Sequence, residues 1–297
     1  MYNKTLFVLF IAATIYLSSC CTSKKAVTSL PQLKGSYLGQ QPPGLTPKKF
    51  APDFIATEKR EFGCTFSPDL KEFYFARQVS ENKYTIFFTK EEGGSWTEPK
   101  MAPFCGSYFC NEPYINHDGS RMYFGSVRSV PGVGGETIWT WYMDKTDDGW
   151  GVPWPLNFWA MYVTSTTDGV LYFTIQGPGG ACLAKSIPND GKYNRSEGLG
   201  APFLSEYWDG HPCIAPDESF LIFDSENRPG VTGTGLFISF KNHDGTWTQP
   251  VPMKDKLGNA GYAMLSPDGK YLFYSNIDDI YWVDAKIIDE FKPASLR

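Results

Sequence analysis

The sequence predicts an all-β fold built from many short strands, and three observations support this prediction. The 297 residues include 29 Gly and 22 Pro, which favour turns, and long helical patterns are scarce. Hydrophobic residues make up 42% of the chain and aromatic residues 16%, which is enough for a large core. A turn motif followed by an aromatic strand recurs five times. The chain is therefore expected to repeat one β-sheet unit.

The clearest copy of the turn motif is SPDGKYLFYSN at residues 266–276. Its Ser-Pro-Asp-Gly start suits successive positions of a type I turn, and a strand rich in aromatic residues should begin at Lys270. The aspartates of the five turns are separated by 49, 50, 49 and 51 residues; they are Asp69, Asp118, Asp168, Asp217 and Asp268. Such a constant period indicates five structural repeats.

Each repeat is expected to contain four strands. One short strand precedes the turn, an aromatic strand follows it, and a third strand leads through a hairpin to a Trp-bearing strand, as in GSWTEP, DGWGVP and DGTWTQP. In the third repeat Tyr193 stands where the Trp is expected. Four strands in about 50 residues match one blade of a β-propeller.

The two ends of the repeat array predict how the ring closes. The fifth repeat stops before its Trp strand, whereas residues 45–52, LTPKKFAP, resemble WTEPKMAP at residues 96–103. The N-terminal segment can therefore complete the last blade, which removes exposed sheet edges. We expect one domain over residues 45–297 with five four-stranded blades; a sixth, degenerate blade is the alternative.

The N-terminus predicts export. An apolar run at residues 6–17 is too short to span a bilayer as a helix, and it follows a single Lys. The stretch Leu17-Ser18-Ser19-Cys20 resembles the lipobox of bacterial lipoproteins, which implies that residues 1–19 are a signal peptide and that Cys20 is lipidated. An ordinary cleaved signal is the alternative. We expect a linker at residues 20–44 and a lipid anchor in the cell envelope of a Gram-negative bacterium, facing the periplasm because no acidic cluster follows Cys20.

The repeats resemble the WD40-like repeats of the periplasmic TolB type, whose signature is an S-P-D-G-K turn before an aromatic strand. The copies SPDLK and SPDGK match best, while the second and third copies replace Ser-Pro with Asn116-His117 and Thr166-Thr167. The resemblance covers residues 45–290 and implies a β-propeller. TolB itself has six blades and an additional α/β domain, which we do not expect here, so the resemblance implies no Tol-Pal role. Compact envelope lipoproteins of this repeat class are a closer likeness.

Cysteine spacing suggests a disulfide and no metal site. In an oxidising envelope the close pair Cys105 and Cys110 is the most plausible bridge, with buried free thiols as the alternative. No CxxC motif and no Cys/His cluster has zinc spacing, and we expect no cofactor.

The repeat register predicts a polar site at one mouth of the central channel. Counting back six residues from each turn Asp gives Gly63, Glu112, Tyr162, His211 and Tyr262. Nearby acids and loop arginines extend the set by Glu61, Asp209, Arg77, Arg128 and Arg228. Such residues could exchange protons, stack on sugars and bind a carboxylate. Alternatively, the acids and arginines pair with each other and the tyrosines fill the channel.

Two functions fit these candidates. The net charge of −5 and the absence of basic runs argue against nucleic acid as a partner. The preferred interpretation is a non-catalytic, lipid-anchored propeller that binds a glycan, peptide or envelope protein on its channel face. The alternative is a glycan-active enzyme, a glycoside hydrolase or lyase that resembles sialidases. Two carboxyl groups ~5 to 9.5 Å apart across an open pocket would favour hydrolysis.

Overall fold

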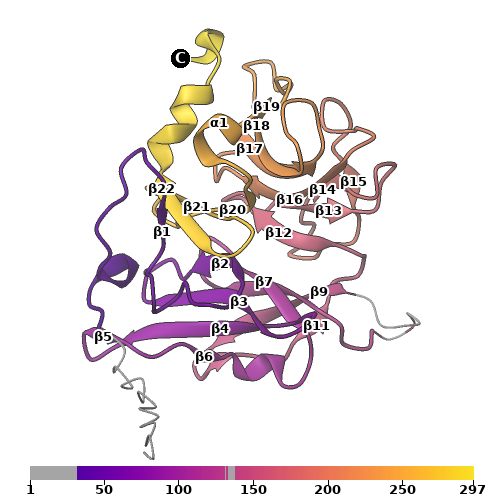
Figure 1. Ribbon diagram of the computed structural model, residues 1–297. Helices are drawn as coiled ribbons and strands as arrows, with labels where there is room; N and C mark the ends of the chain where they lie inside the picture. The colour runs from indigo at the N-terminus through magenta and orange to yellow at the C-terminus, as the bar shows by residue number, and fades with distance from the viewer. Residues whose placement is uncertain (1–31, 131, 133–137) are drawn as a thin grey trace, which may run out of the picture.

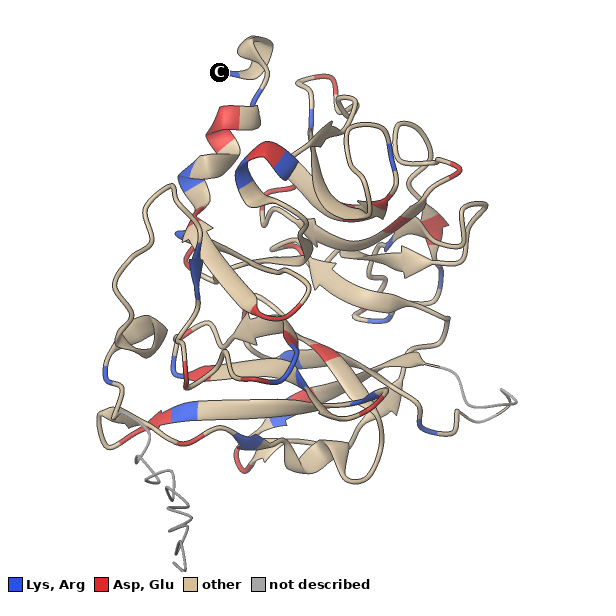
Figure 2. Ribbon diagram, in the orientation of Figure 1, with Lys and Arg blue, Asp and Glu red and all other residues tan. Residues whose placement is uncertain are grey.

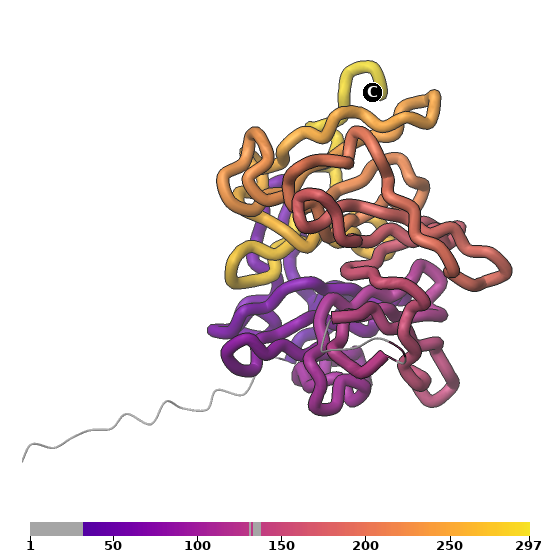
Figure 3. The backbone as a smooth tube through the Cα atoms, turned by 90° about the vertical axis from the view of Figure 1, so that its right-hand side faces the viewer, coloured from indigo at the N-terminus to yellow at the C-terminus, as the bar shows by residue number. Residues whose placement is uncertain are grey.

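Five small antiparallel sheets form a ring in the computed structural model, which describes residues 32–130, 132 and 138–297 (Figure 1). The predicted five-bladed β-propeller is therefore confirmed. The innermost strands β2, β7, β12, β16 and β20 each contact the next one, and β20 contacts β2. Figure 3 shows the blades of the first half of the chain on one side of the ring and those of the second half on the other. The predicted signal peptide and Cys20 lie outside the described residues.

Each blade runs outward from the channel. Blade 1 contains β2 (Glu61–Phe66), β3 (Glu72–Ser80), β4 (Lys83–Glu92), β5 (Ser95–Trp96) and β6 (Lys100–Met101). Blade 2 contains β7 (Cys110–Ile115), β8 (Arg121–Ser126), β9 (Trp139–Thr146), β10 (Gly149–Trp150) and β11 (Trp154–Pro155). Blade 3 contains β12 (Met161–Ser165), β13 (Leu171–Ile175), β14 (Cys182–Ser186) and β15 (Glu197–Gly198).

The remaining blades follow the same plan. Blade 4 contains β16 (Trp208–Ile214), β17 (Phe220–Glu226), β18 (Thr234–Phe240) and β19 (Val251–Pro252). Blade 5 contains β20 (Gly261–Leu265), β21 (Tyr271–Ser275), β22 (Ile280–Asp284) and β1 (Lys48–Lys49). The helical segments are short: α1 (Lys254–Leu257), η1 (Ser36–Gly39), η2 (Pro103–Cys105), η3 (Ala285–Phe291) and η4 (Ala294–Leu296). Within the described residues no helix has the length and apolar character needed to cross a membrane.

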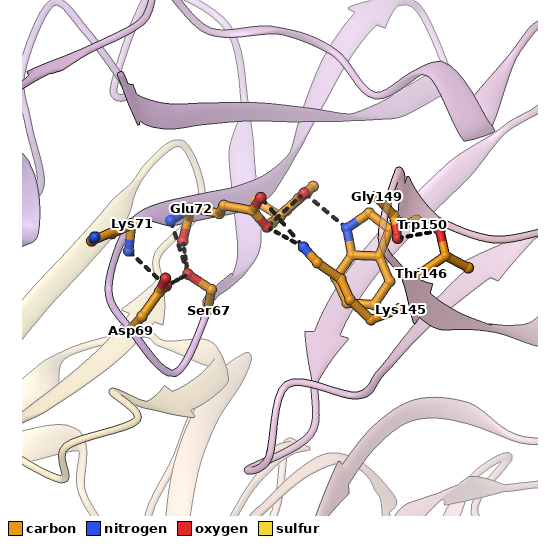
Figure 4. Close-up of polar contacts among 9 residues, drawn as sticks. Ser67, Asp69, Lys71, Glu72, Lys145, Thr146, Gly149 and Trp150 are labelled. Carbon is orange, nitrogen blue, oxygen red and sulfur yellow. Dashed lines mark hydrogen bonds and ion pairs between the residues drawn. The ribbon is translucent and has the colours of Figure 1, made fainter. Parts of the chain in front are cut away.

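The recurring turn is held by its own Ser and Asp side chains. In the first copy the Ser67 hydroxyl donates to the Asp69 carboxylate at 2.6 Å and accepts the backbone N–H of Glu72 at 2.9 Å (Figure 4). In the fifth copy the Ser266 hydroxyl donates to Asp268 at 2.9 Å. These bonds satisfy backbone groups at the start of the second strand of the blade. The motif recurs because each blade has the same turn between its first and second strands.

The Trp hairpins join neighbouring blades. The indole N–H of Trp150, in the hairpin of blade 2, donates to the Tyr74 hydroxyl of blade 1 at 2.9 Å. Beside it, Lys145 forms an ion pair with Glu72 at 3.3 Å (Figure 4). In blades 1 and 2 the Trp lies in a short strand, as predicted: β5 and β10 each pair with the third strand of their blade. A further short strand, β6 or β11, begins four residues after Trp96 or Trp150 and pairs with the same third strand. In blade 4, Trp247 forms only an isolated bridge with Lys241, and the fourth strand β19 follows it.

The N-terminal segment completes blade 5. Strand β1 pairs antiparallel with β22, with Lys48 opposite Trp282 and Lys49 opposite Tyr281 (Figure 1). The backbone N–H of Phe50 then donates to Ile280 at 2.9 Å. The phenyl ring of Phe50 is fully buried among aromatic side chains of blades 1 and 5. The predicted closure is confirmed.

The packed domain begins before residue 45, so the predicted linker over residues 20–44 is too long. Tyr37 and Leu38 are buried, and the Tyr37 hydroxyl donates to Asp268 at 2.5 Å. Trp96 donates its backbone N–H to Leu33 and its indole N–H to Gly35, both within 2.9 Å. This segment forms an irregular 3-10 turn at Ser36–Gly39 instead of a strand, so it has no periodic pattern from which its packing could be predicted.

Charged side chains of both signs are interspersed over the ring, and the C-terminal helical segment carries both as well (Figure 2). The interior is apolar and strongly aromatic. Within segment η3, Ile287 and Ile288 are buried against the core shared by blades 4 and 5. The ends of the repeat array are therefore anchored by packing as well as by strand pairing.

Candidate functional site

Each innermost strand contains a bulge at the channel position that the register predicts. Strand pairing shifts register within β2, β7, β12, β16 and β20. The residue at this point has a left-handed backbone in every blade: φ is 50° at Gly63, 54° at Glu112, 52° at Tyr162, 47° at His211 and 55° at Tyr262. This conformation costs a residue with a side chain about 1 to 2 kcal/mol. Such strain is typical of positions that the surrounding structure fixes, functional sites included.

Three of these five residues line a cavity of about 990 Å³ that opens at one end of the ring. Glu112 and His211 come from blades 2 and 4, and Tyr262 comes from blade 5. More than half of the remaining lining is aromatic or polar: Phe62, Tyr84, Phe109, Trp208, Arg60, Asn111, Asp224, Glu226, Thr234, Asn259, Ser275 and Asn276. A concave aromatic cavity with a few convergent polar groups is typical of small-molecule binding sites.

His211 lies between two carboxylates. Its Nδ1 atom is 2.9 Å from both oxygens of Asp224, and its Nε2 atom is 3.7 Å from Oε1 of Glu112. Burial lowers the pKa of His211, but the facing carboxylates of Asp224 and Glu112 raise it by more, so the pKa lies above its ordinary value. The imidazole is therefore held in its protonated form over a wider pH range than in water.

Glu112 has an unused hydrogen-bonding atom in the cavity wall. The side chain is 4% exposed, and its Oε1 atom accepts a hydrogen bond from the Asn111 amide at 2.9 Å. Its Oε2 atom and the amide oxygen of Asn111 are buried without a partner among the described residues. Burial raises the pKa of Glu112, although the neighbouring His211 opposes this effect. A buried acceptor without a donor is costly, so a ligand that supplies donors would be stabilised here.

Two glycines let the site assemble. A side chain at Gly210 would come within 2.5 Å of the Trp208 ring, and one at Gly261 within 2.4 Å of the Asp224 carboxylate. The Trp208 ring, in turn, has its centroid 5.1 Å from that of His211. The backbone N–H next to Gly261, that of Tyr262, donates to Asp224 at 3.1 Å. These contacts fix the orientation of the imidazole and of the carboxylate that it contacts.

The two tyrosines differ in their access to the cavity. Tyr262 stacks on His211 with ring centroids 4.1 Å apart and lines the cavity. Tyr162 contacts the edge of the same imidazole at 5.0 Å, but it is buried and its hydroxyl donates to the Ala263 carbonyl at 2.7 Å. Gly63 contributes no side chain. Tyr262 can therefore contact a ligand, whereas Tyr162 only packs against the imidazole from within the protein.

Four of the candidate charged residues lie outside this cavity, because they pair within their own blades. Glu61 forms an ion pair with Arg77 at 2.7 Å, and Asp209 forms one with Arg228 at 3.0 Å. Both arginines also donate to backbone carbonyls of the segments that enter the blades. These two pairs hold the outer ends of the innermost strands.

Blade 2 has a thiol where blades 1 and 4 have these acids. Cys110 lies eight residues before the turn Asp, as Glu61 and Asp209 do. Arg128 donates to the Phe104 carbonyl and to the Ser126 hydroxyl, and it also lies outside the cavity. The hydrogen bond from Cys105 lowers the pKa of Cys110, and Arg128 adds to this effect.

The predicted bridge between Cys105 and Cys110 is not formed in the structure. Both residues are free thiols with no solvent exposure, and their sulfur atoms share a hydrogen bond. Cys110 also donates to Ser126 at 3.7 Å. The two side chains are therefore close, as their spacing suggested, but they are packed as a pair of small apolar groups.

The sequence analysis missed several residues of the site, among them Arg60, Asn111, Trp208 and Asp224. Asp224 had a usable signal, because it lies seven residues after its turn Asp, where the other repeats have Ala76, Gly125, Ile175 and Ser275. It is the one charged residue at that repeat position. Trp208 and Arg60 had none, since each lies just before the predicted register begins. Among the described residues no group of three or more His, Cys, Asp and Glu is arranged to hold a metal ion.

Comparisons with known proteins show the fold and no family. No family model matches the chain, and no curated protein matches it by sequence. Among solved structures, it is similar to an α-L-arabinofuranosidase from Lactobacillus brevis, at 11% identity and a TM-score of 0.50, over 78% of this chain and 91% of the other.

Two further solved structures are similar at lower TM-scores. One is a protein from Agrobacterium tumefaciens assigned as TolB, at 17% identity and a TM-score of 0.47, over 74% of this chain and 73% of the other. The other is the native arabinanase of Bacillus subtilis, at 13% identity and a TM-score of 0.43, over 78% and 94%. At such identities the likeness extends to the β-propeller architecture alone.

Proposed function

We propose that this protein is a non-catalytic binding propeller whose ligand is a carbohydrate held in the cavity at the channel mouth. The observation that carries the proposal is the composition of the cavity: five aromatic side chains line it, and the buried Glu112 has an acceptor atom without a partner among the described residues. Aromatic faces pack against the C–H faces of sugar rings, and buried acceptors suit their hydroxyl groups. A concave cavity of about 990 Å³ fits a short oligosaccharide better than a protein surface.

The placement of the acids supports binding over hydrolysis. Hydrolysis needs two carboxyl groups facing one another across open space, where a glycosidic bond can lie. Here the imidazole of His211 fills the space between Glu112 and Asp224. The other predicted acids, Glu61 and Asp209, are neutralised by arginines outside the cavity. The propeller fold itself hosts both binding proteins and enzymes.

A glycan-active enzyme is the second candidate, and one observation favours it. Asp224, His211 and Glu112 form a buried chain in which one carboxylate orients an imidazole toward a second acid, an arrangement that can move protons. Incubating the protein with every glycan that it binds, and measuring new reducing ends or unsaturated products, separates the candidates. Turnover that is lost in Glu112→Gln would overturn the binding proposal.

The binding test uses aromatic and acidic variants of the cavity. We expect Trp208→Ala and Glu112→Gln to keep the fold and to weaken binding of glycans identified on an array by roughly tenfold or more, because each removes a direct contact. Trp154→Ala is the matched control, since Trp154 is 60% exposed and lies outside the cavity. If all three variants bind as the wild type does, the ligand site lies elsewhere on the molecule.

We further propose that Cys20 carries a lipid that anchors the propeller to the cell envelope on its periplasmic side. The support is the lipobox-like stretch before Cys20 in the sequence. Cys20→Ser is expected to abolish labelling by a fatty-acid analogue and to release the protein from the membrane fraction. Unchanged partitioning of this variant would contradict the anchor, and protease treatment of intact cells tests which side the domain faces.

A further inference from the structure

Arg60 is a cation on the cavity wall with few partners of its own. It precedes strand β2, and its guanidinium group lies over the rings of Phe62 and Tyr84, at 5.2 and 5.9 Å from their centroids. Within the described ranges, the one hydrogen bond of its side chain goes to the Tyr84 hydroxyl at 3.3 Å. The Nε atom is buried and has no hydrogen-bond partner in the described part of the chain.

Other arginines near the ring are engaged differently. Arg77, Arg121 and Arg228 each form an ion pair with a carboxylate at 2.6 to 3.0 Å. For Arg60 no carboxylate of the described residues lies within ion-pair distance. A charged donor that is partly removed from water and left unpaired costs free energy, which an incoming anion would recover. Its forked guanidinium binds carboxylates in a bidentate manner.

Two residues of the neighbouring blade 2, Glu112 and Asn111, have the complementary requirement. Oε2 of Glu112 and the amide oxygen of Asn111 are buried acceptors without donors. Hydroxyl groups satisfy such acceptors, whereas a second anion would be repelled there. The cavity also contains Asp224 and Glu226, so it tolerates little additional negative charge. A ligand with several hydroxyl groups and a single negative charge at one end meets both requirements.

We infer that the cavity selects an acidic saccharide, a uronic-acid unit whose carboxylate binds Arg60 while its hydroxyl groups donate to Glu112 and Asn111. The inference rests on the proposed carbohydrate-binding function and adds the chemical class of the ligand. The sugar ring of this uronic-acid unit packs on the aromatic side chains of the cavity, between Arg60 and the two acceptors. Selectivity comes from the charge of Arg60, and general affinity comes from the aromatic rings.

The test compares acidic oligosaccharides with neutral counterparts that differ in one group. The probes are oligosaccharides with one terminal galacturonate, glucuronate or mannuronate unit on otherwise neutral sugars, each paired with its carboxyl-reduced form, and the readout is the dissociation constant by calorimetry at low salt. The wild type is expected to bind at least one acidic member about tenfold or more tightly than its reduced form. Arg60→Gln should remove this preference while leaving the melting temperature and the affinity for the reduced form nearly unchanged.

A matched control separates Arg60 from a general charge effect. Lys59→Gln removes a neighbouring positive charge from an exposed residue outside the cavity, and it should keep the preference. If the wild type binds only neutral saccharides, or binds each pair equally, the inference is wrong and the proposed function stands. If the preference persists in Arg60→Gln, the cation responsible is another residue and the inference is also wrong. Binding of no saccharide at all would overturn the proposed function itself.

Discussion

At the scale of single residues, the channel mouth combines one backbone conformation with several different side chains. The same left-handed conformation occurs at Gly63, Glu112 and His211, although only Gly adopts it without strain. The bulge in each innermost strand thus fixes where a side chain starts, whatever its chemistry. Blades with the same backbone can then contribute an acid, an imidazole or an aromatic ring to one cavity.

The environment of His211 predicts a pH dependence of stability. Its pKa is raised in the folded state, so the folded protein keeps a proton that the unfolded chain releases. This contribution is fully present below the unfolded pKa of about 6.5 and is lost as the pH rises through the folded pKa. The pKa of Glu112 is also raised, so its contribution to the free energy of unfolding likewise falls as the pH rises above about 4.5. Stability should therefore fall as the pH rises.

The measurement is the free energy of unfolding between pH 5 and 9 for the wild type and for His211→Gln. The variant should be less stable at pH 6, because Asp224 and Glu112 lose the cation between them, and its curve should be flatter above pH 6.5. The exposed Glu226 also faces this imidazole and adds a smaller effect. Parallel curves for the two proteins would show that His211 does not retain its proton on folding.

At the scale of elements, the Trp hairpins of blades 1, 2 and 4 contact segments that are distant in sequence. Trp96 is buried and donates its indole N–H to Gly35 of the N-terminal segment, while Trp247 is half-buried and packs on Phe203 at 5.4 Å. The hairpin therefore bonds to a part of the chain that is distant in sequence. Strand pairing within a blade could not provide this connection.

Replacing Trp96 with Ala is expected to lower the free energy of unfolding by about 3 to 5 kcal/mol, because a large buried ring and a buried hydrogen bond are both lost. Trp247→Ala should cost less, since its ring is only half-buried. Trp154→Ala, at an exposed site, should change stability by about 0.5 kcal/mol or less. Chemical denaturation measures all three. Equal costs for the three variants would contradict the role of the hairpin at Trp96.

The sequence predicted the turns and inner strands correctly, because both have strong local signals. The Ser and Asp of each turn bond within a few residues, and the spacing of the repeats sets the strand register. The outer strand β1 was predicted as well, because residues 45–52 resemble residues 96–103. The contacts of residues 33–44 depend on distant partners, so no local pattern revealed them. Glu112 and His211 lie at the repeat position that the register predicts for the channel mouth. Arg60 lies before the predicted register begins, so the repeat gave no indication of it.

At the scale of the whole molecule, the ring depends on the N-terminal segment. Tyr37, Leu38 and Phe50 are buried there, and β1 supplies the outer strand of blade 5. Each such side chain stabilises the fold by about 1.5 to 3 kcal/mol, so together they approach the total stability of a typical domain, about 5 to 15 kcal/mol. The segment is an essential part of the fold.

Deleting residues 20–53 is therefore expected to lower the melting temperature sharply or to prevent folding. Deleting residues 20–31 is the matched control, since it leaves every one of these contacts in place. Thermal unfolding followed by near-ultraviolet circular dichroism reports the aromatic packing directly. A long deletion that melts at the wild-type temperature would show that the ring does not need β1.

The pairing of β1 with β22 also has a consequence for the order in which the protein can be made. Strand β1 leaves the ribosome before any complete blade, whereas its partner at residues 280–284 emerges only after blades 1 to 4. Those four blades can each form sheets during synthesis, but β1 must wait unpaired until β22 has been made. Contacts between such distant segments are slow to form. Closure of the ring therefore comes after the other blades have been synthesised, and until then the newborn chain exposes the unpaired edge of β1.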